Sequence, residues 1–221
     1  AECLEKLVLD VKYGTGAFMK NLADAEILAS GMIAVGREMG VEVHAVLNEM
    51  SEPTGCAVGN ALEVIEALEC LNGRGPADLR KVVLDLSETI AGVSRGKLED
   101  MLNDGTARRK FDELVTRQGG KPEDLQCLSE IHKAPQILDV IAPASGNVTG
   151  VDAGKIGQAS LELGAGRSKV DDGVDFAVGL DRLVKSGAKV SAGDVIARVH
   201  ARSKESAARA ESAVQSAISI A

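Results

Sequence analysis

Residues 7–19 read LVLDVKYGTGAFM, and the pattern of this stretch sets the architecture of the first part of the chain. The apolar run that ends at Val11 is typical of a strand, and the small residues Gly14 and Gly16 indicate a tight turn. Apolar residues then recur at helical spacing as far as Met39, and residues 41–47 alternate as a second strand does. This order predicts a strand–turn–helix–strand unit with parallel strands and a right-handed crossover.

The composition is that of a globular protein with an aliphatic core. Of the 221 residues, 45% are hydrophobic and only 2% are aromatic. The formal net charge is −8, and basic residues form no stripe interleaved with aromatic rings, so we expect no nucleic-acid partner. No apolar run approaches the roughly 20 residues that a membrane helix needs, so we expect no membrane association.

The cysteines show neither a CxxC pair nor the spacing of zinc ligands. We therefore predict reduced thiols that pack as small hydrophobic groups in a cytoplasmic protein. The four are Cys3, Cys56, Cys70 and Cys127. No phosphate-loop or HExxH motif is present in the sequence, and no organic cofactor is expected.

After the second strand, the sequence is mainly helical. A polar loop at residues 48–55 precedes a helix expected from about residue 57 to residue 71, and Pro76 begins another. In parallel sheets, ligands bind beyond the carboxyl ends of the strands, so the turn at 14–18 and the loop at 48–55 are expected to lie side by side. The helices up to residue 131 are interpreted as a packed scaffold.

Near Pro135 the helical periodicity gives way to short strands. They are predicted at residues 136–142, 147–151, 175–178 and 195–200, with helices at 153–163 and 203–220. We therefore predict an α/β protein with two domains. Residues 1–133 form part of a parallel-sheet α/β domain with a helical layer, and residues 134–221 form a strand-rich α+β domain of barrel-sandwich or hammerhead type.

Two groups of residues are candidate binding sites. At the first turn, Lys12 and backbone N–H groups suit a ligand and Phe18 suits a flat ring, whereas the structural alternative places Phe18 in the core. At the helix entry, the carbonyls of Thr54 and Ala57 and the carboxylate of Glu66 suit a hard cation. The alternative is an ordinary helix entry with Glu66 in a surface ion pair, and the residues alone leave both questions open.

Several separated segments together resemble one family, the thymidine and pyrimidine-nucleoside phosphorylases. Residues 10–19 are similar to the family's "DVKxGxGAFM" segment, and residues 55–64 are similar to its "GxAxGNxxEV" segment. Residues 163–167, 174–179 and 193–201 follow its C-terminal pattern in the same order. The resemblance covers nearly the whole chain.

The resemblance implies phosphorolysis, in which inorganic phosphate attacks the anomeric carbon of a pyrimidine (deoxy)nucleoside. The products are (deoxy)ribose 1-phosphate and the free base. By motif, Phe18 corresponds to a residue of the base pocket, and Lys12 lies beside it without a decided role. Thr54 and Ala57, through their carbonyls, and Glu66 correspond to ligands of a monovalent cation, potassium.

The family's "KxSTGG" phosphate loop and "SKK" lysine precede the matching region, so the resemblance implies that this chain is a C-terminal portion. Its catalytic residues are then expected upstream, its partner is the N-terminal portion of the same enzyme, and the complete enzyme is a homodimer. We expect the chain to be inactive alone. Thr54, Cys56 and Ala165 depart from the family pattern, which has Leu, Tyr and Gly at these positions.

Two other functions stay open at this point. Residues 142–148 and 184–194 resemble the half-motifs of biotinyl and lipoyl domains, although the carrier-lysine hairpin is missing. The chain would then be a non-catalytic binding or scaffold module. A relative of the AMP phosphorylases, acting on nucleotides, is the other alternative.

Overall fold

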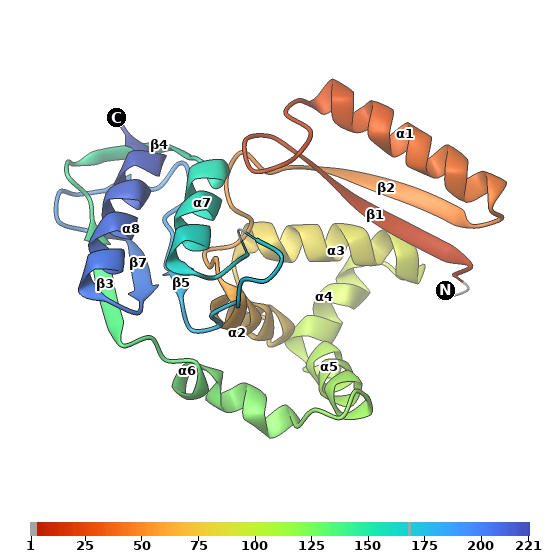
Figure 1. Ribbon diagram of the computed structural model, residues 1–221. Coiled ribbons are helices and arrows are strands. Elements are labelled where there is room, and N and C mark those ends of the chain that lie inside the picture. The colour runs from red at the N-terminus through yellow and green to blue at the C-terminus, as the bar shows by residue number, and fades with distance from the viewer. Residues whose placement is uncertain (1–3, 168) are drawn as a thin grey trace.

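The structure is a computed structural model that describes residues 4–167 and 169–221, so Cys3 lies outside the described residues. It is a mixed α/β protein whose two parts lie side by side (Figure 1). We call residues 4–133 the N-terminal part and residues 134–221 the C-terminal part. Within the described ranges, no helix combines the length and the apolar character needed to cross a bilayer.

The chain begins with the predicted strand–turn–helix–strand unit. Strands β1 (Lys6–Tyr13) and β2 (Glu42–Glu49) pair in parallel and are joined by helix α1 (Leu22–Glu38). The helix begins after Asn21, whose side-chain oxygen accepts a hydrogen bond from the backbone N–H of Asp24 at 3.0 Å. The parallel pairing of β1 and β2 around α1 confirms the predicted strand–turn–helix–strand unit.

A layer of helices comes next, with α3 along the β1–β2 sheet (Figure 1). Helix α2 begins at Asn60, three residues later than expected, because Val58 is held in an extended pair with Leu180. Each of these two residues donates its backbone N–H to the other's carbonyl at 2.8 Å. The layer comprises α2 (Asn60–Leu71), α3 (Ala77–Ala91), α4 (Arg95–Asn103), α5 (Thr106–Arg117), the 3-10 helix η1 (Pro122–Cys127) and α6 (Leu128–Ile131).

The C-terminal part contains two three-stranded sheets and two helices. One sheet has the order β3-β7-β5 and the other β6-β4-β8, with antiparallel pairing in both. The elements are β3 (Gln136–Ile141), β4 (Gly146–Val151), α7 (Ala153–Leu163), β5 (Gly179–Asp181), β6 (Lys189–Val190), β7 (Val195–Ala201), α8 (Lys204–Ala217) and β8 (Ile218–Ile220).

Two sequence expectations for this part are wrong in detail. Residues 175–178 form a turn rather than a strand, because the Asp175 carboxylate binds the Arg202 guanidinium at 2.5 and 2.7 Å and accepts the N–H of Ala177 at 3.1 Å. The strand begins instead at Gly179. The last helix ends at Ala217, and the next three residues pair with β4.

The main hydrophobic core lies in the C-terminal part. Its fully buried side chains include Ile156, Leu180, Ile196, Val140, Val148, Val178, Val199 and Val214. The N-terminal part has a much smaller core around Val11, Ala25 and Ala29. Much of the apolar pattern of α1 is exposed, with Ile27 72% and Met39 75% accessible, because only two strands are available to cover it. A groove of about 850 Å³ runs along this apolar surface.

Candidate functional site

The turn after β1 and the loop after β2 lie together, as expected for the carboxyl ends of parallel strands. The hydroxyl of Thr15 donates to the carbonyl of Ser51 at 3.0 Å, and the backbone N–H of Gly16 donates to the carbonyl of Met50 at 3.0 Å. The N–H groups of Gly14 and Ala17 also donate to backbone carbonyls. Because the backbone N–H groups of Gly14, Gly16 and Ala17 already donate to carbonyls, the turn is not a self-contained cradle for an anion.

The two predicted substrate-binding residues lie near this edge. The Phe18 ring is 97% exposed, so the structural alternative that placed it in the core is wrong. The Lys12 ammonium pairs with Asp10, and the Asp10 carboxylate also accepts the side-chain N–H of Asn48 at 2.6 Å. Asn48 is buried, which the sequence pattern did not indicate. The binding roles of Phe18 and Lys12 remain predictions.

The structure brings Ala57 and Glu66 together beside the loop that carries Thr54. The Glu66 carboxylate accepts the backbone N–H of Cys56 at 2.9 Å, and Ala57 also contributes a backbone hydrogen bond to it. Burial raises the pKa of the Glu66 carboxyl, although these hydrogen bonds act in the opposite direction. The structural alternative, which placed Glu66 in a surface ion pair, is therefore wrong.

Gly55 makes this close approach possible. Its φ of +79° is in the left-handed region, and a Cβ atom there would lie 2.1 Å from Oε2 of Glu66. A carboxylate has more lone pairs than these hydrogen bonds use, so Glu66 retains acceptor capacity for a cation. Within the described residues, however, no three His, Cys, Asp or Glu side chains cluster as metal ligands.

A lysine from the C-terminal part reaches the same loop. The Lys185 ammonium lies 2.7 Å from Oε1 of Glu52 and 2.8 Å from Oδ2 of Asp78, and it also donates to the carbonyls of Pro53 and Gly55. Despite burial, the hydrogen bonds from Lys185 contribute to lowering the pKa values of Glu52 and Asp78. Their charged forms are therefore favoured in the folded chain.

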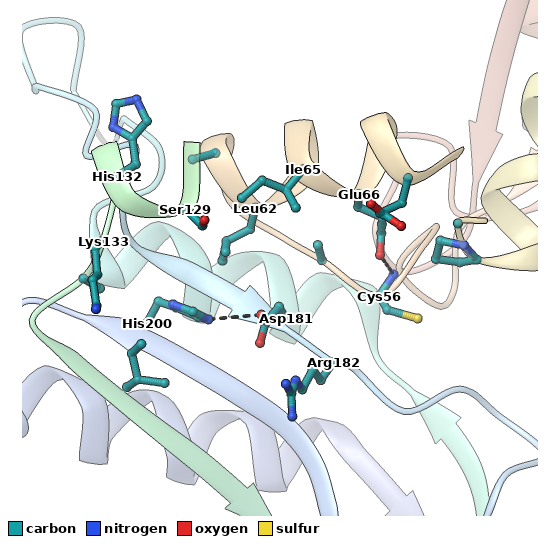
Figure 2. A pocket seen from close by; sticks show the side chains of 17 residues that line it. Cys56, Leu62, Ile65, Glu66, Ser129, His132, Lys133, Asp181, Arg182 and His200 are labelled. Atoms are coloured by element: carbon teal, nitrogen blue, oxygen red, sulfur yellow. Dashed lines mark hydrogen bonds and ion pairs between the residues drawn. The ribbon is translucent and has the colours of Figure 1, made fainter. Parts of the chain in front are cut away.

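A cavity of about 530 Å³ is lined by residues of α2, α6, β5 and β7 and of the loops beside them (Figure 2). Glu66 and Cys56 lie at one end, and His132 and Lys133 lie at the other. Between them, the Asp181 carboxylate is 3.2 Å from Nε2 of His200. The cavity is thus lined by both acidic and basic side chains, which could contact a polar ligand.

Cys56 and Cys70 lack the lowered pKa of an activated thiol. Burial raises the pKa of the Cys56 thiol and raises that of Cys70 to about 11. Cys56, Cys70 and Cys127 are all free thiols, as predicted, but Cys127 is exposed, so the prediction that the cysteines pack as small hydrophobic groups is wrong for Cys127.

We expect iodoacetamide at mildly alkaline pH to alkylate Cys127 in the folded chain roughly 100-fold faster than Cys70, because the thiolate is the reactive form and Cys70 is buried. Peptide mass spectrometry over a time course measures both rates. In urea the two rates should converge, which is the control. Similar rates in the folded chain would contradict the burial of Cys70.

Comparison with known proteins identifies the family of this arrangement. Residues 147–221 match the family described as pyrimidine nucleoside phosphorylase C-terminal domain. The pyrimidine-nucleoside phosphorylase of Bacillus subtilis (strain 168) is 39% identical over 206 residues, which cover 89% of this chain and 48% of the relative. The corresponding protein of Staphylococcus aureus (strain USA300) is 37% identical over 210 residues, covering 91% and 48%.

Residues 147–221 therefore form a pyrimidine nucleoside phosphorylase C-terminal domain. The chain corresponds to the C-terminal portion of these proteins and spans about half the length of the curated relatives it matches. The resemblance drawn from the separated sequence segments is thereby confirmed.

The sequence contains the phosphorylase segments but no pattern that indicates the residues holding the β2–α2 loop. Glu52, Asp78 and Lys185 stand far apart in the sequence and belong to none of the matching segments. The only available signal was the position of Glu52 shortly after a strand of a parallel pair. No local pattern connects it with Lys185, which lies 133 positions later and reaches Glu52 only through the fold.

Proposed function

We propose that this chain supplies the C-terminal portion of an enzyme that cleaves pyrimidine (deoxy)nucleosides by phosphorolysis. A phosphate oxygen forms a bond to the anomeric carbon while the bond from that carbon to the base nitrogen breaks. The base leaves with the electron pair and takes up a proton. The products are (deoxy)ribose 1-phosphate and the free pyrimidine. The similarity over 89% of the chain to a pyrimidine-nucleoside phosphorylase carries the proposal.

The arrangement of the loops supports this role. Phe18 and Lys12 lie at the carboxyl edge of β1, beside the loop after β2, where open α/β sheets bind ligands. An exposed ring is suited to stack on a flat base. We propose that Phe18 forms one wall of the base site and that Lys12 lies beside it.

We also propose a potassium site on the β2–α2 loop, formed by the carbonyls of Thr54 and Ala57 and the carboxylate of Glu66. The position of Glu66 against the loop backbone supports it. No organic cofactor is proposed.

We propose that the remainder of the enzyme packs on the apolar groove along α1, β1 and β2. The groove exposes large side chains such as Ile27, Val35 and Met39 beside an open two-stranded sheet. The relatives are about twice as long as the matched region, so they contain chain to cover it. The proposal includes a homodimer in the cytoplasm, a division into domains at residues 133 and 134, and a C-terminal domain of barrel-sandwich type.

The test combines this chain with the separately produced N-terminal half of the Bacillus subtilis relative. We expect no phosphorolysis by the 221-residue chain alone. The mixture should release free base from uridine or thymidine, and only when phosphate is present, as followed by chromatography. Phosphorolysis by the chain alone would overturn its proposed incompleteness. A stable complex of the two halves without phosphorolysis would overturn the proposed activity.

The position of Lys185 weighs against the alternative of a biotinyl- or lipoyl-like carrier. A carrier lysine is presented to its modifying enzyme on a turn, whereas Lys185 is bound by Glu52 and Asp78. Intact mass that includes biotin or lipoate would favour the carrier function.

A further inference from the structure

The Lys185 side chain crosses from the C-terminal part to the loop after β2. Its ammonium contacts oxygen atoms of four residues, which we call the Lys185 cage: the carboxylates of Glu52 and Asp78 and the carbonyls of Pro53 and Gly55. The contacts to Glu52, Asp78 and the Gly55 carbonyl measure 2.7, 2.8 and 3.1 Å. The lysine side chain is only 28% exposed.

Both carboxylates are held in place without the help of Lys185. The Asp78 carboxylate accepts the backbone N–H groups of Gly55 at 3.0 Å and of Leu79 at 2.9 Å. Glu52 accepts both the backbone N–H and the hydroxyl of Ser186. Two carbonyl groups converge on the same point, which their dipoles disfavour unless positive charge lies between them. The cage is therefore a built cation site.

The number of oxygen partners distinguishes this cage from an ordinary ion pair. An ammonium has three N–H donors, yet four residues supply oxygen atoms around it. Coordination by carboxylate and carbonyl oxygens is also how proteins bind spherical cations. If the ammonium were removed, no positive charge would balance the two carboxylates and the two carbonyl dipoles.

We propose that Lys185 is a tethered monovalent cation, which occupies an oxygen cage able to bind free ammonium or potassium when the lysine is removed. By filling the cage, it fixes Pro53 and Gly55 on either side of Thr54. The C-terminal part thereby determines the position of the β2–α2 loop. This inference stands on the geometry of the cage and does not depend on phosphorolysis.

The test is Lys185→Ala in the complete 221-residue chain, dissolved in tetramethylammonium chloride, whose cation is too large for the cage. Loss of the ammonium leaves two carboxylates close together, so we expect the melting temperature to fall by ~5–10 °C. Replacing the salt with ammonium or potassium chloride at equal ionic strength should restore at least half of this loss with saturable dependence. The wild-type chain shows how much of the salt dependence comes from the potassium site proposed at Glu66, and the recovery of Lys185→Ala should exceed that change.

Two variants serve as controls. Lys185→Met places an apolar chain in the cage and should be destabilised without recovery in ammonium. Lys81→Ala removes an exposed partner of Asp85 and should show neither effect. If Lys185→Ala is unfolded in tetramethylammonium, circular dichroism shows whether ammonium restores the fold, and recovery would support the proposal. An unchanged melting temperature, or equal stability in all three salts, would overturn it.

Discussion

Replacing Gly59 with valine is expected to destabilise the folded chain by about 3–5 kcal/mol. Gly59 has a φ of +132°, which side chains rarely adopt, and a Cβ atom there would lie 2.5 Å from the carbonyl oxygen of Val178. That clash is with backbone and is not relieved by rotating a side chain. The substitution therefore separates the paired residues Val58 and Leu180, which join α2 to the C-terminal part.

Urea unfolding followed by circular dichroism measures the change, and hydrogen exchange locates it. The backbone N–H groups of Val58 and Leu180 should lose protection first, because they form the reciprocal pair. Gly157→Ala in α7 is the matched control, since its added Cβ would meet no atom within 4 Å and it lies inside a helix. It should be neutral or stabilising by up to ~1 kcal/mol. If both variants lost the same free energy of unfolding, the clash of a Cβ atom at Gly59 would not be the cause of the destabilisation.

Replacing Ile156 with alanine is expected to cost about 3–4 kcal/mol. Ile156 is 0% exposed in α7 and belongs to the main core of the C-terminal part. Its removal loses apolar burial and leaves a cavity that the surrounding β-sheets fill only in part. The same substitution at Ile27, which is 72% exposed on α1, should cost less than about 1 kcal/mol in this chain.

Chemical unfolding of both variants in the same buffer gives the comparison. Because the substitution is identical at both sites, intrinsic helix propensity changes equally and the difference reports burial. If Ile27→Ala costs as much as Ile156→Ala, the apolar face of α1 is covered in solution. A second copy of the chain would then be the first occupant to examine, by measuring the concentration dependence of unfolding.

Local features of the fold were predictable because their signals lie within a few residues of each other. The alternating strand residues predicted β2, and Pro76 predicted the start of α3 to within one residue. In the C-terminal part the helix over residues 153–163 was also predicted with the observed bounds. The strand at residues 179–181 was misplaced because its position depends on pairing with β7 and Val58.

The candidate site divides in the same way. The family segments in the sequence indicated the β2–α2 loop and Glu66, and Glu66 does lie against that loop. The partners of Lys185 were not predictable, since the ammonium meets residues more than a hundred positions away. The exposure of α1 was also not predictable, because its helical periodicity shows which face is apolar but not what covers that face.

The order of residues along the chain was enough to indicate the resemblance to the phosphorylases and the parallel strand–turn–helix–strand unit, both of which are confirmed. Periodicity, capping residues and glycine positions are patterns of residues close together in the sequence, so they can be recognised without a structure. The folded chain alone shows that Lys185 holds the β2–α2 loop and that Val58 pairs with Leu180. Those contacts depend on the docking of two distant parts, whose geometry no local pattern encodes.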